Sequence, residues 1–237
     1  MFLEKVTELL YPRRCPLCDG LLADREKYIC ASCRGKIRFI EGPRCMKCGR
    51  PLRSTAVEYC DNCRRREHPF VRGFAPFVYR NLCQESLMRF KYDHRAEYAG
   101  FYGAAICGFG RELLAEWKPQ LILSVPVHRR RLIKRGYNQA EQIANAVSKQ
   151  TGIPASDRLI RRRRNTKPQK GLTPEERRRN LAGAFTVSKG ARFPERVLLV
   201  DDIYTTGATM DAMTEVLLKH GVKKVYVACV SIAPGRS

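Results

Sequence analysis

The second half of the chain alternates short, fully apolar runs with longer segments in which apolar residues recur at helical spacing. The run LILSVPV at residues 121–127 predicts a buried strand, and the amphipathic segment that follows predicts a helix, which Gly152 ends. The same order recurs with the strand VLLV at residues 197–200, a helix over residues 210–220 and a strand over residues 224–233. Fully apolar strands alternating with helices predict an α/β domain with a doubly wound parallel sheet.

The first part of the chain lacks this pattern, and residue usage changes sharply near position 70. We therefore expect two domains, at residues 1–70 and 71–237, joined by a linker at residues 64–73. At the start of the second domain, residues 74–80 predict a short strand. Two helical stretches are expected within residues 82–117.

The N-terminal segment MFLEKVTELLYPRR carries Glu4 and Glu8 and has no long apolar run, so we expect no secretory signal. No later stretch approaches the roughly 20 apolar residues that a membrane span needs. These features predict a soluble, cytoplasmic protein. In that reducing compartment, closely spaced cysteines favour a metal site over disulfides.

Eight of the 11 cysteines form four CxxC pairs, and each pair begins fifteen residues after the one before it. Two such pairs supply four thiolates in the tetrahedral arrangement that zinc prefers, so eight cysteines suffice for two zinc sites. Iron–sulfur ligation and a disulfide framework are the alternatives. The other three cysteines lie in apolar or mixed segments and are expected to pack in the core: Cys83, Cys107 and Cys229.

The uniform spacing leaves adjacent, alternating and nested pairings of the CxxC units open. We expect both zinc ions to be structural, because four protein ligands leave no position for water or substrate. Metal binding should also be coupled to folding, since this region has few large apolar residues. Adjacent pairing closes the shortest loops, and it predicts one site from Cys15, Cys18, Cys30 and Cys33 and another from Cys45, Cys48, Cys60 and Cys63.

The formal net charge of +22 is far larger than solubility requires, and it predicts attraction to polyanions, of which nucleic acid is the first candidate. The alternative is that part of the excess neutralises the phosphates of a small substrate. Arginines also surround the cysteine pairs. They would contact nucleic-acid phosphates or simply form a solvated face.

Polar residues follow the apolar strand at residues 197–200 directly. Asp201 and Asp202 would be costly in the core, so we expect them at the strand's mouth, where carboxylates can accept hydrogen bonds from a ribose diol. A diol-binding pair beside a phosphate cradle predicts a site for ribose 5-phosphate; the alternative is that these residues only cap the next helix. The cradle is expected where backbone N–H groups, hydroxyls and the helix dipole converge on an anion, at Thr205, Thr206, Gly207, Ala208 and Thr209.

The segment VLLVDDIYTTGAT resembles the phosphoribosyl pyrophosphate (PRPP) motif of the type I phosphoribosyltransferases. Two further segments, VPVHRRRLIKRGYNQA and NTKPQKGLTPEERRRNLAGAF, resemble signatures of the competence protein F (ComF) family, and the resemblance covers essentially the whole chain. It implies a type I phosphoribosyltransferase-like doubly wound sheet with an N-terminal double zinc ribbon. It also implies binding of PRPP together with Mg²⁺.

The resemblance implies roles for two basic segments. The basic loop HRRRLIKRGYN and the residues just before it would hold pyrophosphate, through Pro126, Val127, Arg130 and Arg135; a merely solvated loop is the alternative. A second segment, near residues 161–180, corresponds to the mobile flap that closes over substrate in this superfamily. An arginine-rich strip that grips single-stranded DNA would look much the same.

Two functions follow. The first is a PRPP-binding protein that handles single-stranded DNA in DNA uptake during natural transformation, with other DNA-uptake proteins as further partners. The alternative is an active phosphoribosyltransferase, which transfers the 5-phosphoribosyl group of PRPP to a nitrogen nucleophile in nucleotide metabolism or salvage. The sequence identifies neither the acceptor of the phosphoribosyl group nor a general base.

Overall fold

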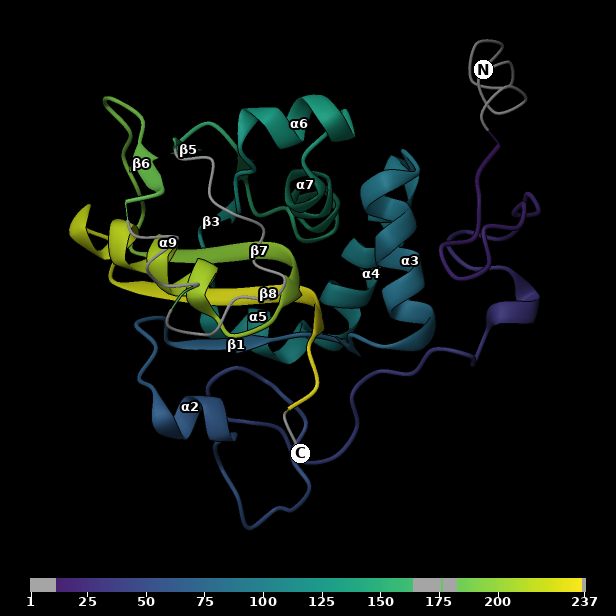
Figure 1. Ribbon diagram of the computed structural model, residues 1–237, viewed down its shortest axis with the longest axis horizontal. Helices are drawn as coiled ribbons and strands as arrows, with labels where there is room; N and C mark the ends of the chain where they lie inside the picture. The colour runs from purple at the N-terminus through teal and green to yellow at the C-terminus, as the bar shows by residue number, and fades with distance from the viewer. Residues whose placement is uncertain (1–11, 164–175, 177–182, 236–237) are drawn as a thin grey trace.

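The computed structural model describes residues 12–163, 176 and 183–235. Its centre is a sheet of parallel strands in the order β1-β8-β7-β3-β4 (Figure 1). The strands are β1 (Arg72–Phe74), β3 (Leu121–Ser124), β4 (Ala155–Ser156), β7 (Arg196–Tyr204) and β8 (Lys224–Ile232). This order is that of a doubly wound α/β sheet, as the apolar runs predict.

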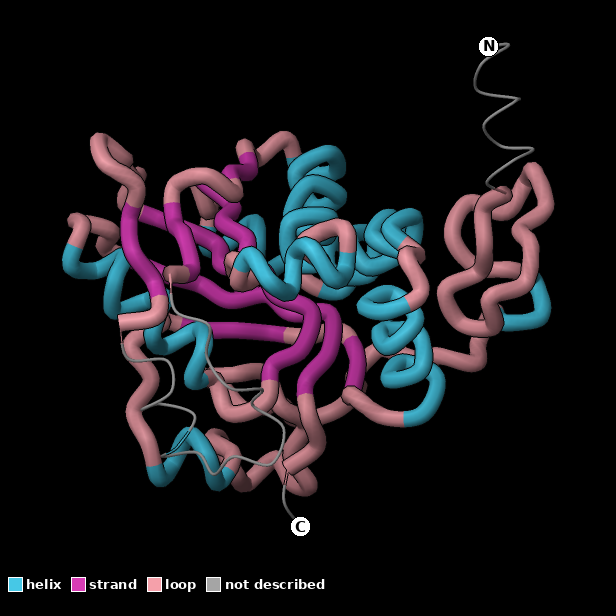
Figure 2. The backbone as a smooth tube through the Cα atoms, turned by 45° about the horizontal axis from the view of Figure 1, so that its top comes forward, coloured by secondary structure: helices cyan, strands magenta, loops and turns pink. Residues whose placement is uncertain are grey.

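The two faces of the sheet are covered by different helices, as the tube in Figure 2 also shows. On one face, Leu198 and Val200 of β7 join a core with α4 (Ala99–Phe109) and α7 (Gln139–Thr151). On the other face, Val197 and Leu199 pack with α9 (Ala208–Lys219). The amphipathic helix expected before Gly152 is confirmed, and so is its end at Gly152, which has a φ of 74°.

The helices between β1 and β3 follow the expected order, except that the second expected stretch is divided in two. The helical stretches are α3 (Asn81–Tyr92), α4 and α5 (Arg111–Trp117), with the break between the last two at Gly110. The single strand expected at residues 74–80 is instead split into β1 and β2 (Phe77–Val78), which both pair with β8. No helix among the described residues is long and apolar enough to cross a membrane.

Two segments expected to be loops are regular structure. The basic stretch after β3 forms the short helix α6 (Arg129–Arg135), because the His128 side chain accepts the backbone N–H of Arg130 and Gly136 ends the helix at a φ of 78°. Strand β7 continues past Val200 through Asp201 and Asp202 to Tyr204, since its partner β8 stays in register up to Ile232. An antiparallel pair, β5 (Ile160–Arg162) with β6 (Phe185–Val187), flanks the segment expected as a flap.

The N-terminal cysteine-rich region packs on the second domain in two places. The first CxxC unit contributes Cys15 and Leu17 to the core beside α3 and α4, at the far end of the molecule in Figure 1. The third and fourth units pack with α9 through Cys45, Cys48 and Cys60, on the side of β1 where α2 (Asp61–Arg65) lies. The segment expected as a linker is partly buried in this interface. The boundary near residue 70 stays a prediction.

Candidate functional site

Two carboxylates and a tight turn lie together at the carboxyl end of β7. Ser124 of the neighbouring strand β3 pairs with Val200, so the exits of both strands reach the same edge of the sheet. Ligands bind at this edge in doubly wound sheets. The backbone N–H of Val125 donates to the carbonyl of Val200 at 3.0 Å, and Pro126 and Val127 follow Val125 in the chain.

Asp202 is buried, and its Oδ2 lies 2.6 Å from the Nζ atom of Lys91, the second-last residue of α3. The side chains are 12% and 15% exposed, so solvent screens this ion pair only weakly. Lys91 was not expected at the site. A single lysine among 45 basic residues carries no signal in the sequence, and only the fold brings α3 to the end of β7.

Asp201 is the more perturbed carboxyl group. Burial, followed by the neighbouring charge of Asp202, raises its pKa from 3.8 to about 7. The backbone N–H of Asp202 donates to its Oδ1 at 2.9 Å, and the cations of Lys91 and Arg162 act in the opposite direction on the pKa. Burial and the neighbouring carboxylate therefore disfavour the charged form of Asp201, which a bound cation would stabilise.

The turn after β7 has the features of an anion site. Gly207 adopts a φ of 84°, and a Cβ atom there would lie 2.4 Å from the Tyr204 hydroxyl, so the position requires glycine. The turn leads into α9, whose first residues are Ala208 and Thr209. Within the described part of the chain, the buried Oγ1 atom of Thr206 has no hydrogen-bond partner. An orphaned hydroxyl at a helix N-terminus fits a bound phosphate oxygen.

The predicted pyrophosphate arginines lie on α6. Arg130 is exposed there, whereas Arg135 donates to Gln139 Oε1 at 3.0 Å and lies over the Tyr92 ring at 5.3 Å. The pyrophosphate assignment of Pro126, Val127, Arg130 and Arg135 stays a prediction.

Arg162, which is outside that prediction, interacts electrostatically with Asp201. Burial and then the charge of Arg131 lower the pKa of Arg162 to about 10, while Asp201 acts to raise it. Arg162 on β5 is thus within electrostatic range of both Arg131 on α6 and Asp201 on β7. The long sequence separations between them hide this from sequence reasoning.

Asn138, whose role the motif left open, has a clear structural one. Its Oδ1 accepts the backbone N–H of Ala140 and caps α7, while its Nδ2 donates to the carbonyl of Val125 at 3.1 Å. It thus ties the start of α7 to the segment that follows β3. The flap residues at 164–175 and 177–182 lie outside the described residues.

The eight CxxC cysteines form two clusters, one of Cys15, Cys18, Cys30 and Cys33 and one of Cys45, Cys48, Cys60 and Cys63. This is the adjacent grouping that the loop-closure argument favours. In each cluster the sulfur atoms lie within 4.8 Å of one another, and the Cys18–Cys30 and Cys48–Cys60 distances are both 3.7 Å. A tetrahedron with Zn–S bonds of about 2.3 Å needs sulfurs about 3.8 Å apart, so both donor sets fit zinc.

The two clusters share one local fold. Backbone N–H groups of Cys15 and Cys45 donate to the carbonyls of Gly20 and Arg50, at 2.8 and 2.7 Å. Gly49 has the positive φ of 75° that this turn needs. The first and third CxxC units of the repeat thus form two copies of the same zinc-ribbon turn.

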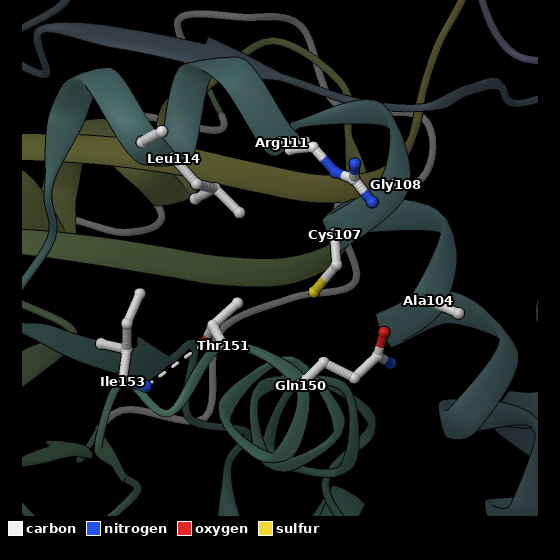
Figure 3. Close-up of a pocket in the computed structure, with 9 residues that line it drawn as sticks. Ala104, Cys107, Gly108, Arg111, Leu114, Gln150, Thr151 and Ile153 are labelled. Carbon is white, nitrogen blue, oxygen red and sulfur yellow. Dashed lines mark hydrogen bonds between the residues drawn. The ribbon is translucent and has the colours of Figure 1, made fainter.

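Of the three remaining cysteines, Cys83 and Cys229 are buried as expected, but Cys107 is only half-buried. It lines an open cavity of about 580 Å³ between α4, α5 and the end of α7, together with Arg111, Gln150 and Thr151 (Figure 3). In Figure 3, Thr151 is tied to Ile153, whose N–H donates to the Thr151 hydroxyl. The cavity contains none of the predicted site residues.

Comparison with known proteins defines the class. Residues 6–64 match the double zinc ribbon domain, and residues 134–236 match the phosphoribosyl transferase domain. The chain is therefore a double zinc ribbon followed by a phosphoribosyltransferase-type domain.

Curated relatives give the family. Competence protein F of Haemophilus influenzae is 32% identical over 221 residues, covering 90% of this chain and 94% of the relative. DNA utilization protein YhgH of Escherichia coli O157:H7 is 28% identical, covering 94% and 98%, and competence protein ComFC of Bacillus subtilis is 29% identical, covering 87% and 89%. The chain belongs to the competence protein F family.

Proposed function

We propose that this protein binds PRPP at the carboxyl ends of β3 and β7 and acts in DNA uptake, where it handles single-stranded DNA in the cytoplasm. One observation carries the proposal: Asp201 and Asp202 stand next to a glycine turn whose buried Thr206 hydroxyl has no partner within the described residues. A ribose and its 5-phosphate need a diol acceptor beside an anion cradle, and this edge of the sheet offers both.

Three groups of residues would bind the three parts of PRPP, which are the ribose, the 5-phosphate and the diphosphate. The carboxylates of Asp201 and Asp202 accept the ribose hydroxyls and through them orient Mg²⁺, which supplies positive charge to the diphosphate. The turn and the start of α9, residues 205–209, hold the 5-phosphate. Arg130 and Arg131 on α6 and Arg162 on β5 would add guanidinium donors for the oxygens of the diphosphate.

The DNA role is supported by two independent features. Relatives over nearly the full chain are named as competence and DNA utilization proteins. The net charge of +22 attracts a phosphate backbone, and arginines of α6, of β5 and of the residue just after β5 are exposed, at Arg129, Arg130, Arg161 and Arg163.

Calorimetric titration with PRPP and MgCl₂ tests the binding proposal. We expect saturable binding to the wild type and at least a tenfold loss in a variant carrying Asp201→Asn and Asp202→Asn. Glu215→Gln, which changes an exposed carboxylate on α9, should leave the affinity unchanged. If all three proteins bind PRPP with equal affinity, the PRPP site does not lie at this edge of the sheet.

Active phosphoribosyl transfer is the second candidate, and Asp201 favours it because a carboxyl with a pKa of about 7 can take up a proton near neutral pH. In that reaction the bond from the anomeric carbon to pyrophosphate breaks, a carbon–nitrogen bond forms, and the nitrogen loses its proton to a base. Release of pyrophosphate from PRPP, measured with a panel of bases and amines, tests it. If the protein binds PRPP but releases no pyrophosphate with any of these compounds, transfer to those acceptors is ruled out.

A further inference from the structure

The second zinc ribbon, defined here as residues 41–63, is hydrogen-bonded to the proposed 5-phosphate turn. Arg50 follows the third CxxC unit, is 6% exposed, and donates from Nη2 to the carbonyl of Thr205 at 2.7 Å. Its Nη1 donates to the carbonyl of Ala233, just beyond β8. One buried guanidinium thus links the ends of both central strands to the ribbon.

The fourth CxxC unit makes the adjacent contact. Asn62, which stands between Cys60 and Cys63, donates from Nδ2 to the carbonyl of Thr206 at 3.3 Å. The same amide lies 3.1 Å from Nε2 of His68. Both peptide carbonyls of the turn are therefore held by side chains within two residues of the zinc ligands.

A third link reaches the first turn of α9. Asp211 there is 2% exposed; its Oδ1 is hydrogen-bonded to His68 Nδ1 at 2.8 Å, and its Oδ2 forms an ion pair with Arg66 Nη2 at 2.6 Å. With Asn62 donating to Nε2, the proton of a neutral His68 lies on Nδ1, which is the nitrogen that faces Asp211. The residues just after the ribbon thus fix the direction of the helix that closes the turn.

These bonds set where the turn's donors point. In a planar trans peptide the C=O and N–H groups point in opposite directions. Anchoring the carbonyls of Thr205 and Thr206 on the ribbon therefore turns the N–H groups of Thr206 and Gly207 away from it, to the side where an anion would be held. Loss of the ribbon's fold would release both peptide units.

We propose that Arg50 and Asn62 are positioning residues for the phosphate turn, and that zinc at Cys45, Cys48, Cys60 and Cys63 is thermodynamically linked to phosphate binding. The inference rests on the proposed PRPP site. Linkage is reciprocal, so zinc in this ribbon tightens PRPP binding and PRPP tightens zinc binding by the same factor. We expect a factor of roughly 10, within the usual range of about 5 to 150.

The first ribbon provides an internal control. Its side-chain hydrogen bonds to the second domain, within the described residues, include those from Arg89 to the carbonyl of Leu17 at 2.9 Å and from Arg95 to Asp19 at 2.9 Å. Both contacts are made by α3 or the segment after it, and neither involves residues 205–209 of the turn. Zinc in the first ribbon should therefore be insensitive to PRPP.

The test is zinc transfer from the full-length protein to excess 4-(2-pyridylazo)resorcinol, with and without saturating PRPP and MgCl₂. In the wild type we expect one of two zinc equivalents to be released about tenfold more slowly with PRPP and the other at an unchanged rate. Arg50→Ala and, separately, Asn62→Ala should abolish the slowing and weaken PRPP binding about tenfold. Arg53→Ala, an exposed arginine of the same ribbon, should do neither.

The outcomes separate the two proposals. If the wild type binds PRPP but neither zinc equivalent is slowed, the linkage is wrong and the PRPP site stands. If wild-type protein with two zinc ions does not bind PRPP in calorimetry, the proposed function itself fails. Because the wild-type comparison needs no substitution, a variant that fails to fold does not decide the result.

Discussion

Asp201 makes the free energy of unfolding depend on pH in a direction opposite to that of most aspartates. Burial raises its pKa from 3.8 to about 7, so the native state holds a proton that the unfolded chain has released. Stability from this group is fully present below pH 3.8 and is lost as the pH rises towards about 7. Asp201→Asn, which mimics the protonated form, should therefore stabilise the protein at neutral pH.

The size of the effect follows from the two pKa values. About three pH units separate them, and each is equivalent to about 1.4 kcal/mol, which sets an upper limit of about 4 kcal/mol on the gain above pH 7. The difference in unfolding free energy between Asp201→Asn and the wild type should grow from pH 5.5 and level off above about pH 7.

Urea denaturation in zinc-containing buffer between pH 5.5 and 8.5 measures this difference, and Glu215→Gln controls for the loss of an exposed carboxylate. If Asp201→Asn is more stable than the wild type but binds PRPP more weakly, Asp201 lowers stability and serves ligand binding. A variant that is less stable than the wild type at pH 8, or equally stable at every pH, would refute the reasoning.

Three further predictions concern the same region. Lys91→Met should lower the free energy of unfolding, measured by urea denaturation, by about 1–3 kcal/mol, because it leaves Asp202 unpaired. Adding Asp202→Asn should restore most of this loss. If it restores none, the two residues do not interact. Gly207→Ala should lower the free energy of unfolding by roughly 2–4 kcal/mol, because the backbone has a φ of 84° and the added Cβ overlaps the Tyr204 hydroxyl. It should also abolish PRPP binding. A melting curve equal to that of the wild type would contradict the geometry of the turn. Binding of oligo(dT), followed by fluorescence anisotropy, should weaken steeply between 50 and 200 mM salt, and a flat response would exclude the arginines as its basis.

Local pattern was enough to predict much of the fold. The apolar runs at β3, β7 and β8 and the amphipathic helix α7 are visible because their burial follows the periodicity of their own residues. The zinc clusters were also predictable, because the CxxC units indicate metal sites and the shortest loop closure favours adjacent units.

What the pattern missed depends on the rest of the molecule. Helix α6 has no apolar period, and it forms because His128 and Gly136 cap a basic run. The extension of β7 through Asp201 depends on pairing with Cys229 in β8, which no local rule supplies.

The contacts of Lys91, Arg162 and Arg50 with the site span long stretches of sequence. Arg50, for example, is 155 residues from Thr205. In a chain with 45 lysines and arginines, no local feature distinguishes these three from the solvated ones. Only the fold brings these three residues to the site.

The central claim is that the turn after β7 holds the 5-phosphate of PRPP. Electron density from crystals grown with PRPP and MgCl₂ tests it most directly. The account predicts a phosphate within hydrogen-bond distance of the Thr206 hydroxyl and of the backbone N–H groups of Thr206 and Gly207, with the ribose hydroxyls on Asp201 and Asp202. A phosphate bound only to the arginines of α6, with the turn empty, would contradict it.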